Sequence, residues 1–191
     1  MPFYSQRPFV QLLLSGVFER FPKLKFVMTE MGCAWIPPML TWLDGILKNV
    51  RDNGAIGELR FTEDQILRQS ATDYFLQNCW VGASQPGPAD AEVRTMMGDD
   101  RFMWGSDYPH DEGTYPFTRE HLRQLFHDTP AEELQRLLGG NAAKLYDFDL
   151  DKLAPIAATV GPTVAELSEP LTELPAEPNA ALLKAMPSIP S

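Results

Sequence analysis

The chain has 191 residues, of which 44% are hydrophobic and 22% charged, so it is long enough for one ordinary domain with a sizeable core. Its 16 basic residues against 26 acidic ones give a formal net charge of −10, which argues against binding to nucleic-acid phosphate or to an anionic membrane surface. No apolar run approaches the roughly 18 residues of a membrane span, and the N-terminus lacks the pattern of a signal peptide. We therefore expect a cytoplasmic protein without a nucleic-acid or membrane partner, with Cys33 and Cys79 as reduced, packed thiols.

The first half of the chain alternates between helical and strand-like patterns. Pro8–Phe21 carries apolar residues at helical spacing and predicts a well-buried helix that Pro22 ends. The apolar run Lys25–Thr29 predicts a buried parallel strand. A helical pattern predicts a second helix over Ile36–Val50, with Pro37 and Pro38 in its first turn, where proline is tolerated. Thr62 resembles the N-cap of a short third helix.

The second half continues this alternation. Strands are predicted at Asn78–Ala83 and Arg101–Gly105, with a helix over Ala89–Met97 between them. Three helices follow, at Thr118–His127, Pro130–Leu138 and Ala142–Tyr146, the last one capped by Asn141 after a break at Gly139 and Gly140. Alternating strands and helices indicate a parallel α/β fold, but three strands alone leave the edges of a sheet open.

The C-terminal stretch has a different composition. Seven of the 17 prolines lie between Pro155 and Pro190, and aromatic residues are absent from Ala154 onward. No apolar face persists there long enough to bury itself. We therefore expect residues 1–152 to fold and residues 153–191 to form a Pro-rich, mostly disordered acidic tail.

Candidate catalytic residues follow two of the predicted strands. Asp107 comes just after a strand, where barrels of parallel strands place metal ligands and bases, although an Asp in a turn is an equally good interpretation. His110 lies in the same loop beside two acidic residues and is either a ligand, a base or a solvent-exposed residue. Glu30 directly follows the strand Lys25–Thr29. It is a candidate ligand, a candidate acid–base group or a structural hydrogen-bond acceptor. His121, by contrast, lies among charged residues and is expected at the surface, as is His127.

Several familiar motifs are missing. The sequence has no GxxxxGK[ST] loop, no GxGxxG, no HExxH and no GxSxG, so nucleotide-binding, zincin and serine-hydrolase functions lack their essential residues. The three His and two Cys do not have the spacing of a closed zinc site.

Four blocks together resemble the C-terminal part of amidohydrolase-related (amidohydrolase-2) proteins, the group that includes aminocarboxymuconate-semialdehyde decarboxylase. They are SGVFERFPKLKFVMTE, MGCAWIP, WGSDYPHDEGTYP and LLGGNAAKLYDF, within Gln6–Phe148. The resemblance implies a (β/α)₈ TIM barrel with one divalent metal, zinc or manganese, that supports hydrolysis or non-oxidative decarboxylation of a small-molecule substrate. The three predicted strands would be its sixth to eighth.

The same resemblance assigns the site residues. Asp107 matches the family's metal-binding Asp after the eighth strand. Glu30 stands where the decarboxylases carry an acid–base His, a departure that weakens a decarboxylase assignment, because the unperturbed pKa of a carboxyl is about two units lower. The family's HxH pair and middle His have no counterpart, since the strands that carry them are missing.

The function predicted from the sequence is therefore that of a fragment. A whole barrel of this type needs about 250 residues, so we expect the C-terminal part of a metal-dependent hydrolase, incomplete, inactive alone and not retaining the metal. A complementing N-terminal chain or a homo-oligomer is the partner this implies. The alternatives are a carboxy-lyase of the same family, and a non-catalytic remnant or interaction module.

Overall fold

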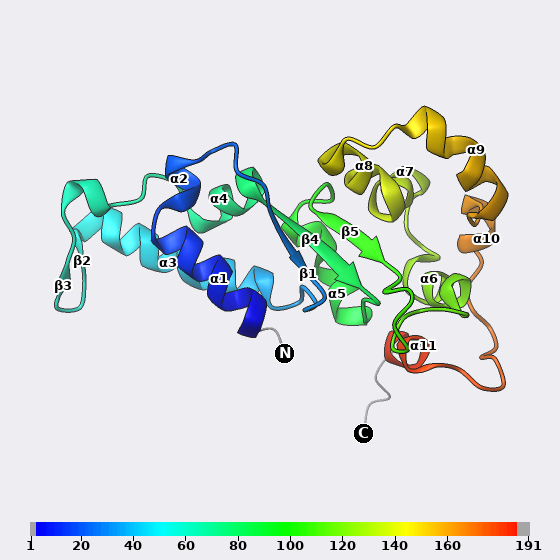
Figure 1. Cartoon of the computed structure of the whole chain (residues 1–191). Coiled ribbons are helices and arrows are strands. Elements are labelled where there is room, and N and C mark those ends of the chain that lie inside the picture. Colours follow the sequence, from blue (N-terminus) through cyan, green and yellow to red (C-terminus); the bar gives the residue numbers. More distant parts are fainter. Residues whose placement is uncertain (1–2, 187–191) are drawn as a thin grey trace, which may run out of the picture.

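The computed structural model describes residues 3–186, and its centre is a three-stranded parallel sheet in the order β1-β4-β5 (Figure 1). The strands are β1 (Phe26–Thr29), β4 (Cys79–Ser84) and β5 (Phe102–Gly105). In the register of the sheet, Phe26 lies beside Cys79 and Val81 beside Phe102. Strands β1 and β5 form the two edges, and neither has an outer partner strand within the described residues. The prediction of an open α/β sheet of three parallel strands is confirmed.

Helices and turns connect the strands. Before β4 lie α1 (Phe3–Leu14), α2 (Val17–Arg20), α3 (Ile36–Asn53), the hairpin β2 (Ala55–Ile56) with β3 (Leu59–Arg60), the 3₁₀ turn η1 (Glu63–Gln65) and α4 (Ala71–Asn78). Between β4 and β5 lie α5 (Pro88–Val93) and η2 (Arg94–Met97). After β5 come α6 (Thr118–Phe126), α7 (Ala131–Gln135), the π-helical turn η3 (Arg136–Gly140), α8 (Asn141–Tyr146), α9 (Leu150–Val160), α10 (Val164–Leu167) and α11 (Ala180–Ala185). None of the described helices combines the length and the apolar character that a bilayer span requires.

The helix pattern differs from the sequence prediction at two glycine sites. The helix expected over residues 8–21 starts five residues earlier and breaks at Gly16, whose φ of 73° only glycine adopts without strain. The break expected at Gly139 and Gly140 is instead a continuous π-helical turn. Asn141 does not cap α8, because its side-chain amide donates hydrogen bonds to the carbonyls of Asp99 and Phe102.

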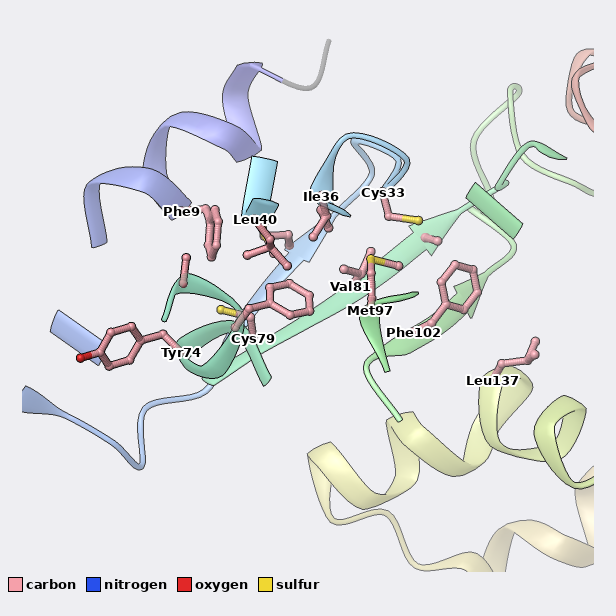
Figure 2. Close-up of a cluster of buried hydrophobic side chains, with 14 of the residues drawn as sticks. Phe9, Cys33, Ile36, Leu40, Tyr74, Cys79, Val81, Met97, Phe102 and Leu137 are labelled. Atoms are coloured by element: carbon pink, nitrogen blue, oxygen red, sulfur yellow. The ribbon is translucent and has the colours of Figure 1, made fainter. Parts of the chain in front are cut away.

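The core forms against one face of the sheet (Figure 2). Alternate residues of β4 are buried because successive side chains of a strand point to opposite faces. Phe9 of α1 and Phe75 of α4 pack edge to face, with ring centroids 6.1 Å apart. Cys33 and Cys79 are free and buried in this core, as the sequence predicts.

The C-terminal segment contains helices where the sequence predicts a mostly disordered tail. Helices α9 to α11 extend from residue 150 to residue 185, so the first of them crosses the expected boundary at residue 152. Leu167 of α10 and Leu182 of α11 are buried because each short helix places one apolar face on α6. Each helix also begins at an N-capping side chain. Residues 187–191 of the predicted tail lie outside the described residues.

Candidate active site

The carboxyl ends of the three parallel strands meet at one edge of the sheet, and each is followed by a residue in a left-handed backbone conformation. These residues are Glu30 after β1, Gln85 after β4 and Asp107 after β5, with φ values of 64°, 41° and 63°. Positive φ is uncommon for residues other than glycine, and such strain concentrates at functional sites. The fold therefore brings Glu30 and Asp107, both predicted from the sequence, to the same end of the sheet.

Asp107 has an enclosed carboxylate, with only 9% of its side chain exposed. One carboxylate oxygen lies 3.1 Å from Nδ1 of His110, and the other accepts a hydrogen bond of 3.3 Å from the side-chain amide of Gln85. The backbone carbonyl of Asp107 also accepts a hydrogen bond from the His110 N–H. Asp107 thus lies in a turn and, at the same time, directs both carboxylate oxygens towards polar partners.

Three potential metal donors come together in this loop. One ligand atom each of Asp107, His110 and Glu112 lies within 4.8 Å of the other two. Ligand atoms on one divalent ion lie at most about 4.4 Å apart, twice the usual metal–oxygen distance, so a small side-chain rotation brings all three into range. Two carboxylates and an imidazole suit manganese or zinc. These residues therefore fit a divalent metal, with exposed His110 and Glu112 free to adjust.

The charges around His110 favour its protonated form. Its hydrogen bond to Asp107 and the charge of that carboxylate raise the pKa of His110, and the carboxylates of Glu112 and Glu30 raise it further. No hydrogen bond or ion pair joins Glu30 to His110 among the interactions of the described residues, so this influence acts through space. The predicted site residues Asp107 and His110 are in direct contact, whereas Glu30 lies near them at the end of the neighbouring strand.

The carboxylate of Asp90 also fixes this edge of the sheet. The buried carboxylate of Asp90 in α5 accepts backbone hydrogen bonds from Cys33 at 2.6 Å, Ala34 at 3.0 Å and Gly87 at 3.2 Å. It therefore joins the loop after β1 to the loop after β4. Burial alone raises the pKa of Asp90, but the hydrogen bonds from these N–H groups outweigh it and hold that pKa below its usual value.

His121 is not at the surface, which corrects the sequence prediction. Its side chain is fully buried beneath the loop after β4, where Nε2 donates a hydrogen bond to the carbonyl of Pro86 at 3.1 Å. Its Nδ1 atom has no hydrogen-bond partner among the described residues. Burial lowers the pKa of His121 to about 4, against a smaller raising effect of the Pro86 carbonyl.

Sequence reasoning missed Gln85, Asp90 and, as a donor, Glu112. A signal was present for Gln85, which directly follows a predicted strand, and for Glu112, which stands two residues after His110. For Asp90 the local signal is limited to its place in the first turn of α5, three residues after Gly87, because its other backbone partners at residues 33 and 34 are 57 and 56 positions away.

Comparisons with known proteins point to one family. The family model described as Amidohydrolase (Amidohydro_2) matches residues 2–148. Among curated proteins, none matches the chain. The solved 5-carboxyvanillate decarboxylase LigW from Sphingomonas paucimobilis is 28% identical, with a TM-score of 0.57 over 73% of this chain and 38% of that one.

Two further solved structures share the fold. An amidohydrolase from Mycobacterium avium subsp. paratuberculosis K-10 is 20% identical, with a TM-score of 0.53 over 72% of this chain and 32% of that one. A dihydroxybenzoic acid decarboxylase from Polaromonas sp. JS666, solved with manganese and the inhibitor 2-nitroresorcinol, is 19% identical, with a TM-score of 0.54 over 75% and 39%.

These matches bear on the predicted fold and family. The chain spans between 32% and 39% of the length of each solved structure, and its sheet is not closed within the described residues. The prediction of a part of a larger amidohydrolase fold is therefore confirmed. Because the family model covers most of the sequence, the chain belongs to the amidohydrolase family.

Proposed function

We propose that the chain contributes Asp107 as a metal ligand to a divalent-metal-dependent active site. The observation that supports this function is the convergence of Asp107, His110 and Glu112 at the carboxyl end of the parallel sheet. Active sites of barrels with parallel strands are assembled at this end. A bound divalent metal supplies Lewis-acid polarisation of a substrate oxygen or of a water molecule.

Each residue has a separate role in this proposal. Gln85 orients Asp107 through the hydrogen bond to one carboxylate oxygen, which leaves the other oxygen facing His110 and the metal position. His110 and Glu112 act as further donors. Glu30, exposed at the end of β1, is the candidate acid–base group, since a carboxylate near the metal can take up or release a proton at the substrate.

For the reaction, we favour non-oxidative decarboxylation of an aromatic carboxylate over hydrolysis. The support is the 28% identity to an enzyme that decarboxylates 5-carboxyvanillate. The acidic Glu30 in place of an imidazole argues in the other direction, because its ordinary pKa is lower. A hydrolase of the same family is therefore the second candidate.

The described residues do not fully enclose the proposed site. Catalytic metal sites use three or more protein ligands and keep one open position inside a shaped cavity. Here two of the three donors are exposed, and both sheet edges lack an outer strand within residues 3–186. We infer that strands from a complementing polypeptide complete the site, and that the chain alone binds metal weakly.

Replacing Asp107 by Asn should abolish metal binding. The wild-type chain is expected to bind Mn²⁺ weakly in a titration followed by electron paramagnetic resonance, and D107N should show no binding, because the most enclosed donor loses its charge. Asp111→Asn is the matched control, since it removes the same charge from the same loop at a residue outside the donor group. Equal Mn²⁺ affinity in wild type and D107N would contradict the ligand assignment.

The isolated chain should release no CO₂ from 5-carboxyvanillate in the presence of Mn²⁺. The reason is the open sheet, which leaves the substrate position exposed to water and without the remaining ligands. The measurement is CO₂ release by the 191-residue chain against Mn²⁺ without protein. Turnover above that background would refute the need for a complementing polypeptide while supporting the decarboxylase assignment.

A further inference from the structure

The loop that carries Asp107 is folded tightly on itself. Ser106 accepts two hydrogen bonds on its carbonyl from Thr114, one from the backbone N–H at 2.8 Å and one from the hydroxyl at 3.3 Å. Thr114 is fully buried. At Gly113, an added Cβ would lie 2.9 to 3.0 Å from three carbonyl oxygens, so a larger residue would push the loop apart. The carbonyl of Gly113 itself is bonded from outside the loop.

That outside contact comes from Asn179, 66 residues away. Its side-chain amide donates hydrogen bonds to the carbonyl of Gly113 at 3.0 Å and to that of Tyr115 at 3.1 Å. Its side-chain oxygen accepts a hydrogen bond of 3.0 Å from the N–H of Leu182, which caps helix α11. Asn179 therefore uses both amide hydrogens on the site loop and its oxygen on the helix.

Helix α11 is itself firmly held. Ala181 and Leu182 are fully buried and Ala185 is 1% exposed, and the helix packs on α6. Lys184 of the same helix donates a hydrogen bond of 2.9 Å to the carbonyl of Gln85. Figure 1 shows α11 beside α6, next to the loops that follow β4 and β5. One short helix thus binds the loop of Gln85 and the loop of Asp107 together.

From these contacts we propose that Asn179 and α11 form a strap that fixes loop 106–116 and thereby positions Asp107. Its role in metal binding rests on the proposed function, but its hold on the loop does not. The strap lies outside residues 2–148, the segment that the family model matches. Asn179 is a positioning residue, because it acts on the metal site only through the backbone of the loop.

The decisive variant is Asn179→Asp. The carboxylate keeps the acceptor that caps α11 but has no hydrogen to donate, so it faces two carbonyl oxygens without a bond. Asn49→Asp is the matched control. Asn49 lies on α3, and its side-chain amide also donates a hydrogen bond to a backbone carbonyl, that of Ala55. Lys184→Met tests the second contact, because it removes only the bond to Gln85 and leaves the buried face of α11 intact.

Hydrogen exchange without metal is the first measurement. In N179D, the amides of Thr114, Gly113 and His110, which are bonded within the loop, should exchange at least tenfold faster than in wild type, because the loss of one hydrogen bond is about a tenfold effect and this variant loses two. The amides of β4 should keep their rates, and N49D should match wild type in loop 106–116 and in β4. Unchanged exchange in the loop of N179D would overturn the strap, whether or not the chain binds metal.

The Mn²⁺ affinity is the second measurement. N179D should bind Mn²⁺ about tenfold more weakly than wild type, although its added negative charge by itself attracts a cation, and K184M should lie between the two. Faster loop exchange with unchanged Mn²⁺ affinity would overturn the positioning role. A wild-type chain that binds no Mn²⁺ would instead overturn the proposed function, and the exchange rates would still decide the strap.

Discussion

Lowering the pH from 7 to 4 should destabilise the folded chain by about 3 kcal/mol through His121 alone. The imidazole is fully buried, and its Nε2 hydrogen is already donated to the Pro86 carbonyl. A second proton would have to go to Nδ1, which has no hydrogen-bond partner within residues 3–186. The folded pKa of about 4 lies below the unfolded value of about 6.5, so only the unfolded chain takes up a proton between these values. Stability is therefore lost as the pH falls through this window.

Urea denaturation at pH 7 and pH 4 would measure this effect. His121→Gln removes the titrating group and should lose about 3 kcal/mol less than wild type over the same pH change. His127→Gln is the control, because it removes a histidine that directly follows the same helix but is only partly buried. If H121Q loses as much stability as wild type, His121 is not the acid-sensitive group.

The fold could be predicted largely from local patterns. Buried parallel strands read as short apolar runs, so the predicted strands lie within about one residue of those observed, for example Asn78–Ala83 against Cys79–Ser84. Helix α4 was missed although its capping signal is in the sequence: Ser70 accepts from the N–H of Asp73, and Asp73 reciprocates. A helix of only eight residues gives a weak periodic signal, and the capping residues are the better guide.

The environment of His121 shows where local patterns fail. Its neighbours Arg119, Glu120 and Arg123 suggest a solvated helix face. Arg119 and Arg123 instead donate hydrogen bonds to Glu166 and Glu169 of the C-terminal segment. The cover over His121 comes from contacts distant in sequence, including the loop after β4. Because the C-terminal segment was expected to be disordered, its packing on α6 could not be foreseen.

Only the part of the candidate site that follows the predicted strands could be predicted from the sequence. The carboxyl ends of parallel strands lie at one edge of a sheet, so Glu30 and Asp107 could be placed together from their positions after two predicted strands. His110 follows Asp107 closely enough to share its loop. Asn179 and Asp90 act across dozens of residues and bind backbone atoms, whose positions only the folded chain defines.

Asp90→Asn should destabilise the chain by about 3 kcal/mol at pH 7. The carboxylate of Asp90 is buried and accepts three backbone N–H groups, and hydrogen bonds to a charged acceptor contribute roughly 1.5 to 3 kcal/mol each. In D90N the oxygen can still face Cys33 and Ala34, but the amide opposes the N–H of Gly87 as donor to donor. The loops after β1 and β4, which begin with Glu30 and Gln85, then lose their common anchor.

The pH dependence separates Asp90 from His121. Because the folded pKa of Asp90 is lowered, its contribution is complete above the unfolded value of about 3.9 and disappears as the pH falls through the folded value. The stability difference between wild type and D90N should therefore stay constant from pH 8 to pH 5, where His121 acts equally in both chains and cancels.

Asp73→Asn provides the matched control for Asp90. Its carboxylate also accepts a backbone N–H, that of Ser70, but at the exposed start of α4, where such a bond contributes about 1 kcal/mol. A loss in D90N no greater than in D73N would show that the Asp90 carboxylate does not hold the two loops. A loss of about 3 kcal/mol with unchanged Mn²⁺ affinity would instead separate the stability of this edge from the geometry at Asp107, since Asp90 anchors the loops of β1 and β4 but not that of β5.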